Sequence, residues 1–419
     1  MGFGQGLSGL KGASQRLDVI GNNIANSGTV GFKASTVSFA DVYASSRVGL
    51  GVQVAAVNQN FSVGTISSTG NQFDLAIDGT DGLFRVIDTS GAVLYTRNGE
   101  FYPNKEGFLV NAQGHKLTGM VRNEETRAYG LTPEPIRVPT GNIAARATGA
   151  NLDDPETGVV FRMNFDAAAK VPGKAFPAFP DNPNAPRVPD PESYNFSAPL
   201  TVYDSLGIAH QLTQYFVKVG DNAWDVYYQI DSNDPLTTPH RVNFLSNGKI
   251  VSEPEDADTT RYTVEYAVGG GANPLVIPIN YAGSTQFEGE YSYAFRQDGF
   301  PTGEYASLSF APDGTVVANY TNGEILEVGY ITLASFVNMQ GLQPVGGNAW
   351  QQTAASGNPT LGRPGTNGMG SIKSQSVEDS NVDMGTELVN MIITQRTYQA
   401  NAQTISAQSE ILQTLLNIR

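Results

Sequence analysis

Apolar side chains near the N-terminus recur at the spacing of a helix with a single apolar stripe. The spacing alternates between three and four residues, with Ser14 and Gly21 in the same register, and the stripe consists of Phe3, Leu7, Leu10, Leu17, Ile20 and Ile24. This heptad pattern predicts a helix that packs along another helix. Glycines interrupt it at positions 6, 9, 12 and 21. Each costs roughly 1 kcal/mol relative to alanine inside a helix, so this helix should need a partner.

The C-terminal end carries a longer stripe with the same alternation. Gln395, Ala402 and Ser409 keep the register of its apolar members, which are Leu388, Met391, Ile392, Tyr398, Ile405, Leu412, Leu415 and Leu416. Only Gly385 interrupts residues 382–419, which contain no proline. The pattern predicts a helix roughly 50 Å long, because each helical residue adds about 1.5 Å. Ser380 and Asp383 suggest a capping box at its start.

The pattern is compatible with two arrangements of these terminal helices. In one, they form only an antiparallel hairpin within the chain. In the other, the paired ends also pack against further copies of the chain. Both arrangements bring the two termini close together. The candidate interface residues are Leu7, Leu10, Leu17, Ile20, Ile24, Leu388, Met391, Ile392, Tyr398, Ile405, Leu412 and Leu416.

The middle of the chain has the alternating pattern of β-strands. In residues 72–120, short alternating runs are separated by X-Gly pairs such as Ser90-Gly91 and Asn98-Gly99, the signal of hairpin turns. This predicts a β-meander. Residues 291–340 show the same alternating runs separated by X-Gly pairs, with turns at Asp313-Gly314 and Asn322-Gly323. Two similar blocks on either side of a third segment predict one split domain with an insertion.

The segment between these blocks has its own composition. It carries most of the formal net charge of −15 and opens with a proline-rich stretch, which excludes a helix there. The predicted fold is mixed but mainly β, with a helical coiled coil at the ends and an outer β-domain inserted in an inner one. The predicted domains are 1–26 plus 382–419 (terminal helices), 27–71 plus 365–381 (linker), 72–148 plus 290–364 (split β-domain) and 149–289 (acidic outer domain).

Charge and composition exclude several classes of protein. A nucleic-acid binder needs a basic surface, whereas the pI is near 4.6. The chain has no cysteine, which excludes disulfides, zinc-thiolate sites and thiol nucleophiles. No apolar run is long enough to span a bilayer, and the N-terminus lacks the pattern of a cleaved secretory signal. We therefore expect no nucleic-acid partner, no membrane span and, if the protein is exported, an uncleaved N-terminus.

The sequence contains no constellation that predicts catalysis. Residues 4–9 match G-x-G-x-x-G but lack the preceding strand that gives the motif meaning. His115, His210 and His240 are isolated from one another and from acidic clusters, so each is interpreted as a turn or surface residue. The acidic run at 253–258 is interpreted as a solvated loop, with weak binding of a hard cation as the alternative. We expect no catalytic residue, cofactor or metal.

The N-terminal helix is followed by a recognisable motif. Residues 17–33 read LDVIGNNIANSGTVGFK, and the sequence around Asn22, Asn23, Asn26, Gly31, Phe32 and Lys33 resembles that of the bacterial flagellar rod, hook and hook-associated proteins. The C-terminal segments SNVD, ELVNMI and QRTYQANAQTI are similar to the partner helix of that family. Asparagine tolerates left-handed backbone and caps its own chain, so it suits a helix end that turns sharply.

The resemblance implies a non-enzymatic structural subunit that assembles into a helical tube. FADVYA at 39–44 and VGLGV at 48–52 resemble the hook members of the family; the distal rod members are the alternative. For a hook, the family implies a flexible joint that transmits torque from rod to filament, a homopolymer, contacts with rod, hook-cap and hook–filament junction proteins, and passage through the flagellar type III export apparatus. It implies an extracellular location in the flagellum. The expected motion is sliding of polar outer domains around helices that hold the subunits together.

Two other classes remain alternatives. A secreted β-rich adhesin would explain the strands and the acidity, but it should carry a signal or an anchor. A polysaccharide-active enzyme would need a cleft with paired carboxylates, which the sequence neither shows nor excludes.

Overall fold

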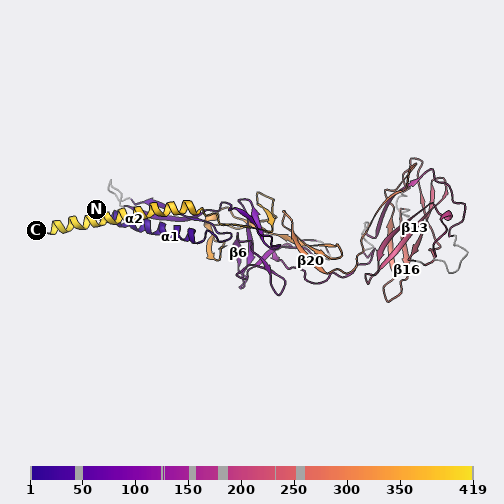
Figure 1. Ribbon diagram of the computed structural model, residues 1–419, viewed down its shortest axis with the longest axis horizontal. Helices are drawn as coiled ribbons and strands as arrows, with labels where there is room; N and C mark the ends of the chain where they lie inside the picture. The colour runs from indigo at the N-terminus through magenta and orange to yellow at the C-terminus, as the bar shows by residue number, and fades with distance from the viewer. Residues whose placement is uncertain are drawn as a thin grey trace. The chain divides into compact units, whose positions relative to one another are not determined.

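The chain forms two compact units in the computed structural model, which describes residues 2–42, 51–123, 126, 128–150, 157–177, 187–231, 233–251 and 260–417 (Figure 1). Unit 1 comprises 1–140, 306–319 and 325–419, and unit 2 comprises 141–305 and 320–324. Most elements are strands, and the only two α-helices in the described residues lie at the ends of the chain. The predicted fold class is confirmed: it is mainly β, with paired terminal helices and one β-rich unit inserted in another.

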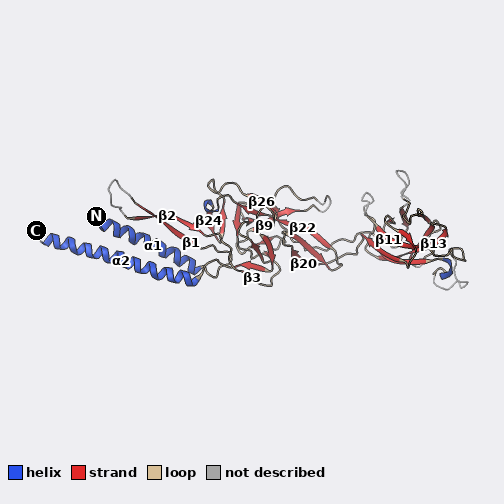
Figure 2. Cartoon of the chain, turned by 90° about the horizontal axis from the view of Figure 1, so that it is seen from above, coloured by secondary structure: helices blue, strands red, loops and turns tan. Residues whose placement is uncertain are grey.

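The terminal helices lie side by side in unit 1 (Figure 2). Helix α1 spans Gly2–Ala25 and helix α2 spans Met384–Asn417. The predicted capping box at Ser380 is wrong, because the backbone N–H of Thr386 donates to Asp383 Oδ1 over 2.6 Å. Asp383 is therefore the residue that caps α2, and this hydrogen bond lowers the pKa of its carboxyl below the ordinary value.

Strands rather than plain connectors follow α1 and precede α2, in the segments predicted as linkers. Strand β1 (Ser35–Asp41) pairs antiparallel with β2 (Val52–Gln59), and this hairpin contacts α1. Strand β3 (Ile66–Ser68) pairs with β28 (Ser376–Glu378), and β4 (Leu75–Asp78) pairs with β27 (Ser371–Ser374). The two ends of the chain are therefore hydrogen-bonded to each other beyond the helices.

A large antiparallel sheet forms the rest of unit 1. Its central order is β20 (Tyr305–Phe310), β21 (Thr315–Tyr320), β22 (Ile325–Ile331), β9 (Lys116–Val121), β5 (Leu83–Ile87), β6 (Val93–Thr96), β25 (Ala349–Gln351) and β24 (Gln343–Gly346). Attached to it are β7 (Tyr102–Pro103), β8 (Leu109–Val110), β10 (Glu134–Pro135), β23 (Leu333–Ser335) and β26 (Thr360–Gly362).

The predicted meander over 72–120 is thus wrong in its pairing order. Strand β5 lies between β6 and β9, and β4 leaves this sheet to pair with β27. Side chains from both halves of the chain make the core on this sheet, including Leu83, Tyr95, Phe336 and Trp350. Periodicity locates strands but carries no information on which distant strand will cover an apolar face.

Unit 2 is built from two β-sheets with a shared apolar core. One sheet has the order β16 (Arg261–Tyr266), β17 (Leu275–Asn280), β11 (Val159–Asp166) and β18 (Thr285–Phe287), with β19 (Ser292–Gln297) also paired to β11. The other has the order β12 (Phe196–Tyr203), β13 (Ala209–Gly220), β14 (Ala223–Ile230) and β15 (His240–Asn243). Buried aromatic residues dominate the core, among them Phe161, Phe165, Phe216 and Trp224.

The limits of unit 2 differ from those predicted for the inserted domain. The prediction assigned 149–289 to the insertion, whereas the compact unit extends over 141–305 and adds 320–324. The reason is strand pairing: β19, predicted in the split domain, pairs with β11 from Val159↔Gln297 to Asn164↔Ser292.

Candidate assembly interface

Helices α1 and α2 approach each other closely at the glycines of α1. A Cβ atom added at Gly6 would lie 3.0 Å from Ile405 Cγ1, and one added at Gly9 would lie 2.8 Å from Asn401 Oδ1. These two pairs run in opposite directions along the helices, so the arrangement is antiparallel. Two of the glycines that weaken α1 as an isolated helix, Gly6 and Gly9, are therefore positions where α2 lies against it, whereas Gly12 faces Phe39 and Gly21 has no atom within 4 Å of an added Cβ.

The predicted stripe of α1 is only partly covered within the subunit. Ile20 is buried, and Leu10, Leu17 and Ile24 are half-buried, whereas Leu7 is 41% exposed. The small residues Gly6, Gly12 and Ala13 are buried, and Gly12 lies against Phe39 of β1.

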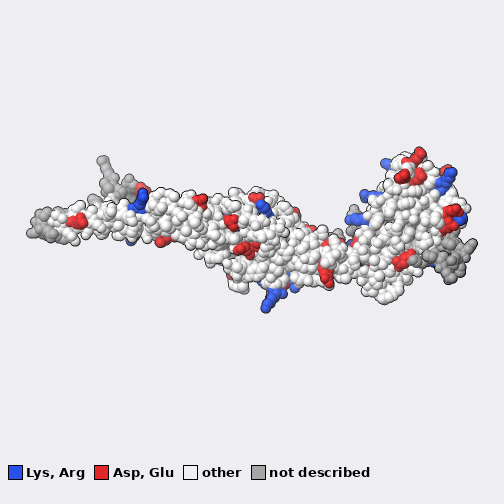
Figure 3. Space-filling view, viewed as in Figure 1, with Lys and Arg blue, Asp and Glu red and all other residues white. Residues whose placement is uncertain are grey.

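The apolar face of α2 is largely uncovered. Met391 and Ile405 are half-buried, while Leu388, Ile392, Tyr398 and Leu412 are exposed, at 46%, 52%, 36% and 55%. The side chain of Leu416 lies outside the described residues. Charged side chains are sparse over the helices on the face that Figure 3 shows. A long, weakly charged helix with exposed aliphatic side chains is typical of an interface that another molecule covers.

The asparagines in the last turn of α1 and directly after it fix the direction of the chain at the end of the helix. Asn23 is buried, its Nδ2 donates to Ser35 O (2.8 Å), and its Oδ1 accepts from Ser35 N (2.9 Å). It thereby pairs with the backbone of the first residue of β1. Asn22 is exposed and accepts from Asn26 Nδ2 (3.1 Å), while Asn26 Oδ1 accepts from Thr29 Oγ1 (3.2 Å).

Gly31 and Phe32 carry the chain from this turn into the core. Gly31 has a φ of +70°, and a Cβ there would lie 2.5 Å from the backbone nitrogen of Asn98, so no other residue fits without movement. Its N–H donates to Glu378 O over 2.7 Å. Phe32 is half-buried, and its carbonyl accepts from Asn381 N (3.4 Å).

Lys33 ends in a buried cluster of three charged side chains. Its Nζ lies 2.5 Å from Glu378 Oε1 and also donates to Ser62 O (2.6 Å). Arg97 Nη1 donates to the other carboxylate oxygen of Glu378 over 3.0 Å. All three side chains are at most 1% exposed. This Lys33–Glu378–Arg97 cluster joins the segment after α1, the large sheet and the segment before α2.

Ion pairing and hydrogen bonds to backbone carbonyls stabilise the buried charges of this cluster. Burial lowers the pKa of Lys33, and the Glu378 carboxylate opposes that effect. Arg97 also donates to Gly79 O (3.0 Å) and Thr80 O (2.8 Å), which are backbone acceptors. The sequence pattern identified Lys33 but not Arg97 and Glu378, because an isolated charge in or beside a short strand gives no signal that it is buried.

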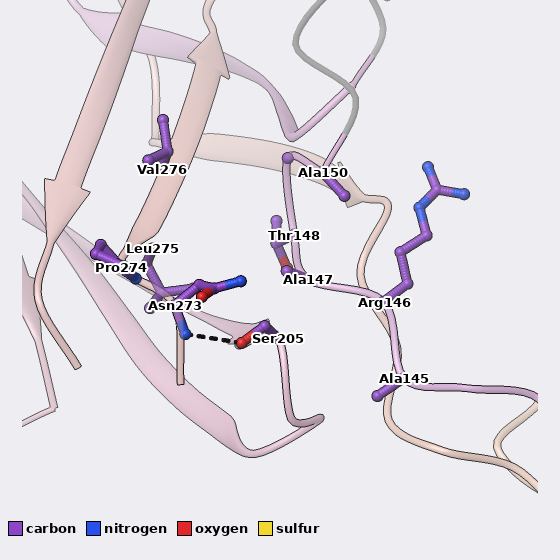
Figure 4. Close-up of a pocket in the computed structure, with 11 residues that line it drawn as sticks. Ala145, Arg146, Ala147, Thr148, Ala150, Ser205, Asn273, Pro274, Leu275 and Val276 are labelled. Atoms are coloured by element: carbon purple, nitrogen blue, oxygen red, sulfur yellow. Dashed lines mark hydrogen bonds between the residues drawn. The ribbon is translucent and has the colours of Figure 1, made fainter. Parts of the chain in front are cut away.

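A hollow of about 430 Å³ in unit 2 is lined mostly by small side chains, and Ser205 Oγ accepts from the backbone nitrogen of Asn273 over 2.9 Å (Figure 4). Arg146 points away from that pair in Figure 4, and its Nη2 atom lies 3.2 Å from Asp298 Oδ2. The described residues include no group of three or more His, Cys, Asp or Glu side chains arranged to hold a metal ion.

His210 departs from its predicted isolation. Its Nδ1 lies 2.8 Å from Asp231 Oδ2 and its Nε2 lies 3.5 Å from Asp204 Oδ2, with the side chain 14% exposed. The acidic run at 253–258 and the motif residues 43–50 lie outside the described residues. No helix within the described residues is long and apolar enough to cross a membrane.

Family models define the class of this protein segment by segment. Residues 5–33 match the model described as flagella basal body rod protein, and 373–418 match the flagellar basal body rod FlgEFG protein C-terminal model. Residues 76–155 match the flagellar hook protein FlgE/F/G D1 domain, and 164–300 match the flagellar basal body protein FlaE D2 domain. The paired helices and the two β-rich units are thus those of a flagellar axial protein.

Full-length relatives narrow this class to one family. The chain is 41% identical over 428 residues to the flagellar hook protein FlgE of Salmonella typhimurium, with 100% of both chains covered. It is 41% identical over 426 residues to that of Escherichia coli K12, again with full coverage of both. The protein from Borreliella burgdorferi is 30% identical over 455 residues, covering 99% of this chain and 98% of its own. The chain belongs to the flagellar hook protein family.

A solved structure agrees in fold. The crystal structure of the Helicobacter pylori flagellar hook protein FlgE2 superposes with a TM-score of 0.54 at 16% identity, covering 74% of this chain and 100% of that one. This likeness concerns the fold alone. The full-length relatives and the family models give the chain the structural role of a hook subunit, in a homopolymer of the flagellar hook and basal body. The distal rod and adhesin alternatives are not favoured, because the full-length relatives from Salmonella typhimurium and Escherichia coli are hook proteins.

Proposed function

We propose that the chain polymerises through its terminal helices, which hold the subunits of the hook tube together. The observation that carries this proposal is the uncovered apolar face of α2. Although α2 packs against α1, its aliphatic side chains remain between 46% and 60% exposed at Leu388, Val389, Ile392, Ile393, Ile411 and Leu412. Monomers rarely leave such a surface in water, so contacts with neighbouring copies should cover it.

The same proposal gives a role to the remainder of the candidate residues. Gly6 and Gly9 of α1 lie against α2 and Ile20 is buried within the subunit, whereas Leu7, Leu388, Ile392, Tyr398 and Leu412 are available to neighbours. A contact between two different surfaces of the same chain does not close on itself and generates an open helical filament. The motif from Asn22 to Lys33 then sets the direction in which the helices leave the β-structure.

Flexibility of the hook would come from the units outside the helices. We assign the acidic unit 2 to the outer surface of the tube, where polar contacts can exchange at little cost. In this proposal the helices stay in contact while units 2 of neighbouring copies slide past one another. Identical contacts between units 2 in straight and curved polymers would contradict it.

The proposed partners are those of a hook subunit. They are further copies of the chain, the rod, the hook cap and the hook–filament junction proteins. The proposed route out of the cell is the flagellar type III export apparatus, with the N-terminus retained because α1 is needed in the polymer. We further propose that the protein has no catalytic activity.

Electron microscopy of negatively stained protein tests the assembly proposal. The full-length chain at high concentration should form tubes, whereas a chain lacking 1–30 and 382–419 should stay monomeric with its β-units folded. Circular dichroism of the shortened chain checks that folding. Folded monomers from the full-length chain at every concentration would overturn the proposal.

A further inference from the structure

A groove lies where α1, α2 and the β1–β2 hairpin meet in unit 1. Its volume is about 440 Å³, and Gly9, Gly12 and Ala13 of α1 line it together with Phe39 and Val52 of the hairpin. The volume is about three times that of a ~150 Å³ engineered cavity that binds benzene. More than one large aliphatic side chain would therefore fit.

The side of the groove formed by α2 is less polar than its residue types suggest. The hydroxyl groups of Thr394 and Thr397 donate to the carbonyls of Asn390 (2.7 Å) and Ile393 (3.0 Å) in their own helix. A hydroxyl that is already satisfied leaves its methyl group as the available surface. Arg16 also lines the groove, and no other described residue forms an ion pair or hydrogen bond with its guanidinium group.

The end of α2 has no partner within the described part of the subunit. Gly6 of α1 faces Ile405 and Gly9 faces Asn401. By the same spacing, the first residue of α1, Gly2, lies opposite residue 409 of α2, and α2 continues beyond it. Figures 1 and 2 both show the C-terminal end of α2 extending beyond the start of α1. We call residues 410–417 the overhang. It carries Glu410, followed by Ile411 and Leu412, which are 60% and 55% exposed.

We propose that the overhang of one copy docks into the groove of a second copy, with Ile411 and Leu412 against its apolar lining and Glu410 beside Arg16. This inference rests on the proposed function, because it needs copies of the chain to meet through their terminal helices. Charge favours this occupant: Glu410 is the only carboxylate of α2 beyond Glu387, and Arg16 is the cation of the groove.

The arrangement has a geometric consequence. Thr397 in the groove and Leu412 in the overhang lie on the same helix, about 22 Å apart at ~1.5 Å per residue. Groove and overhang are different surfaces, so each copy offers one to a neighbour above and the other to a neighbour below. The contact is therefore directional, and for copies whose α2 helices lie parallel it shifts each copy by about that distance along its neighbour.

Engineered cysteines test the contact directly, because the natural chain contains none. Thr397→Cys combined with Leu412→Cys should give a ladder of disulfide-linked oligomers when preformed tubes are oxidised. The two sulfurs cannot pair within one chain, since a disulfide requires Cα atoms within about 7 Å. Each single variant serves as control, because one cysteine per chain allows no product larger than a dimer.

A charge exchange gives a second, independent readout. Arg16→Glu and Glu410→Arg should each raise the critical concentration for polymerisation roughly two- to fivefold, the scale of an exposed ion pair. An equimolar mixture of the two variants should recover the original value, because each groove then meets a complementary overhang. Recovery only when both changes are in one chain would place the pair within the subunit and overturn the inference.

The outcomes separate this inference from the proposed function. Tubes that yield no oligomers beyond dimers from the double cysteine variant would overturn the inference and leave helix-driven assembly intact. A ladder from Leu7→Cys with Thr397→Cys, in place of the Leu412 pair, would assign the groove to α1 of the neighbour and equally overturn it. Absence of tubes from the unaltered chain would overturn the proposed function itself.

Discussion

Lys33 Nζ lies 2.5 Å from Glu378 Oε1, although the two residues are 345 positions apart in the chain. Lys33 follows the turn after α1, and Glu378 is the last residue of β28, shortly before α2. Arg97 of the β-structure contacts the other oxygen of the same carboxylate. One buried carboxylate therefore fixes both helix connections to the sheet, and removing it leaves two cations without their partner.

The first prediction concerns that carboxylate. Glu378→Gln should destabilise unit 1 by about 3–5 kcal/mol, because breaking a buried ion pair leaves uncompensated charge in the interior. The chain has two tryptophans, Trp350 in unit 1 and Trp224 in unit 2. Urea unfolding followed in single-tryptophan variants can therefore read the two units separately, and only the Trp350 transition should move.

Glu192→Gln is the matched control for this variant. Glu192 also contacts a lysine, Lys174, but its side chain is 74% exposed. Exposed ion pairs contribute about 0–1 kcal/mol, so neither transition should change much. Equal effects of the two substitutions would show that the buried cluster does not stabilise unit 1.

The second prediction concerns the backbone at Gly31. Gly31→Ala should destabilise unit 1 because the new Cβ would overlap the backbone of Asn98, 2.5 Å away, which adds about 1–3 kcal/mol to the cost of left-handed backbone. Gly70→Ala provides the comparison: Gly70 has a φ of +74° but no atom within 4 Å of the added Cβ. That variant should lose only about 1–2 kcal/mol. Similar losses in both would contradict a close approach at Gly31.

The third prediction separates assembly from folding. Ile392→Ser should leave the free energy of unfolding of the monomer nearly unchanged, because Ile392 is 52% exposed. Burying such a side chain against a neighbour contributes about 1.5–3 kcal/mol, so the critical concentration for polymerisation should rise at least roughly tenfold. Sedimentation of tubes across a concentration series measures it.

Leu131→Ser tests whether any exposed aliphatic side chain has this effect. Leu131 is 97% exposed in unit 1 but lies outside the helices. Its substitution should leave the critical concentration unaltered. Equal shifts for both variants would mean that general surface hydrophobicity, and not the face of α2, drives polymerisation.

The fourth prediction concerns pH and unit 2. Burial alone would lower the pKa of His210, but the carboxylates of Asp231 and Asp204 outweigh it and raise the pKa above the ordinary value. The folded state therefore binds this proton more tightly than the unfolded chain. The resulting stability is fully present below pH ~6.5 and is lost as pH rises through the raised pKa.

Urea unfolding of unit 2, followed through Trp224 between pH 5 and 8, measures this dependence. The change should be below about 1 kcal/mol, because Asp231 is itself partly exposed and solvent screens the pair. His210→Gln should remove it. A stability that rises over this pH range, or an unchanged slope in the variant, would contradict the assigned role of His210.

The spacing of apolar residues was sufficient to predict those helices and turns whose formation depends on nearby residues in the sequence. The heptad stripes from Phe3 to Ile24 and from Leu388 to Leu416 predicted α1 and α2. The pairs Ser90-Gly91, Asp313-Gly314 and Asn322-Gly323 located turns between paired strands, whereas Asn98-Gly99 lies between β6 and β7, which do not pair with each other. The motif from Asn22 to Lys33 was recognisable because its residue types are needed by the local backbone: asparagine for the turn and glycine for positive φ.

Spacing along the chain was enough to establish that the protein is mainly β, that helices stand at its ends, and that one β-rich unit interrupts another. A single sequence displays such spacing directly. The strand pairing, the place of β19 in unit 2, and the meeting of Arg97 and Glu378 with Lys33 became known only from the folded chain. The same is true of the apolar residues of α2 that remain uncovered. Burial and charge pairing depend on residues hundreds of positions away, and no local pattern encodes which distant residue will arrive.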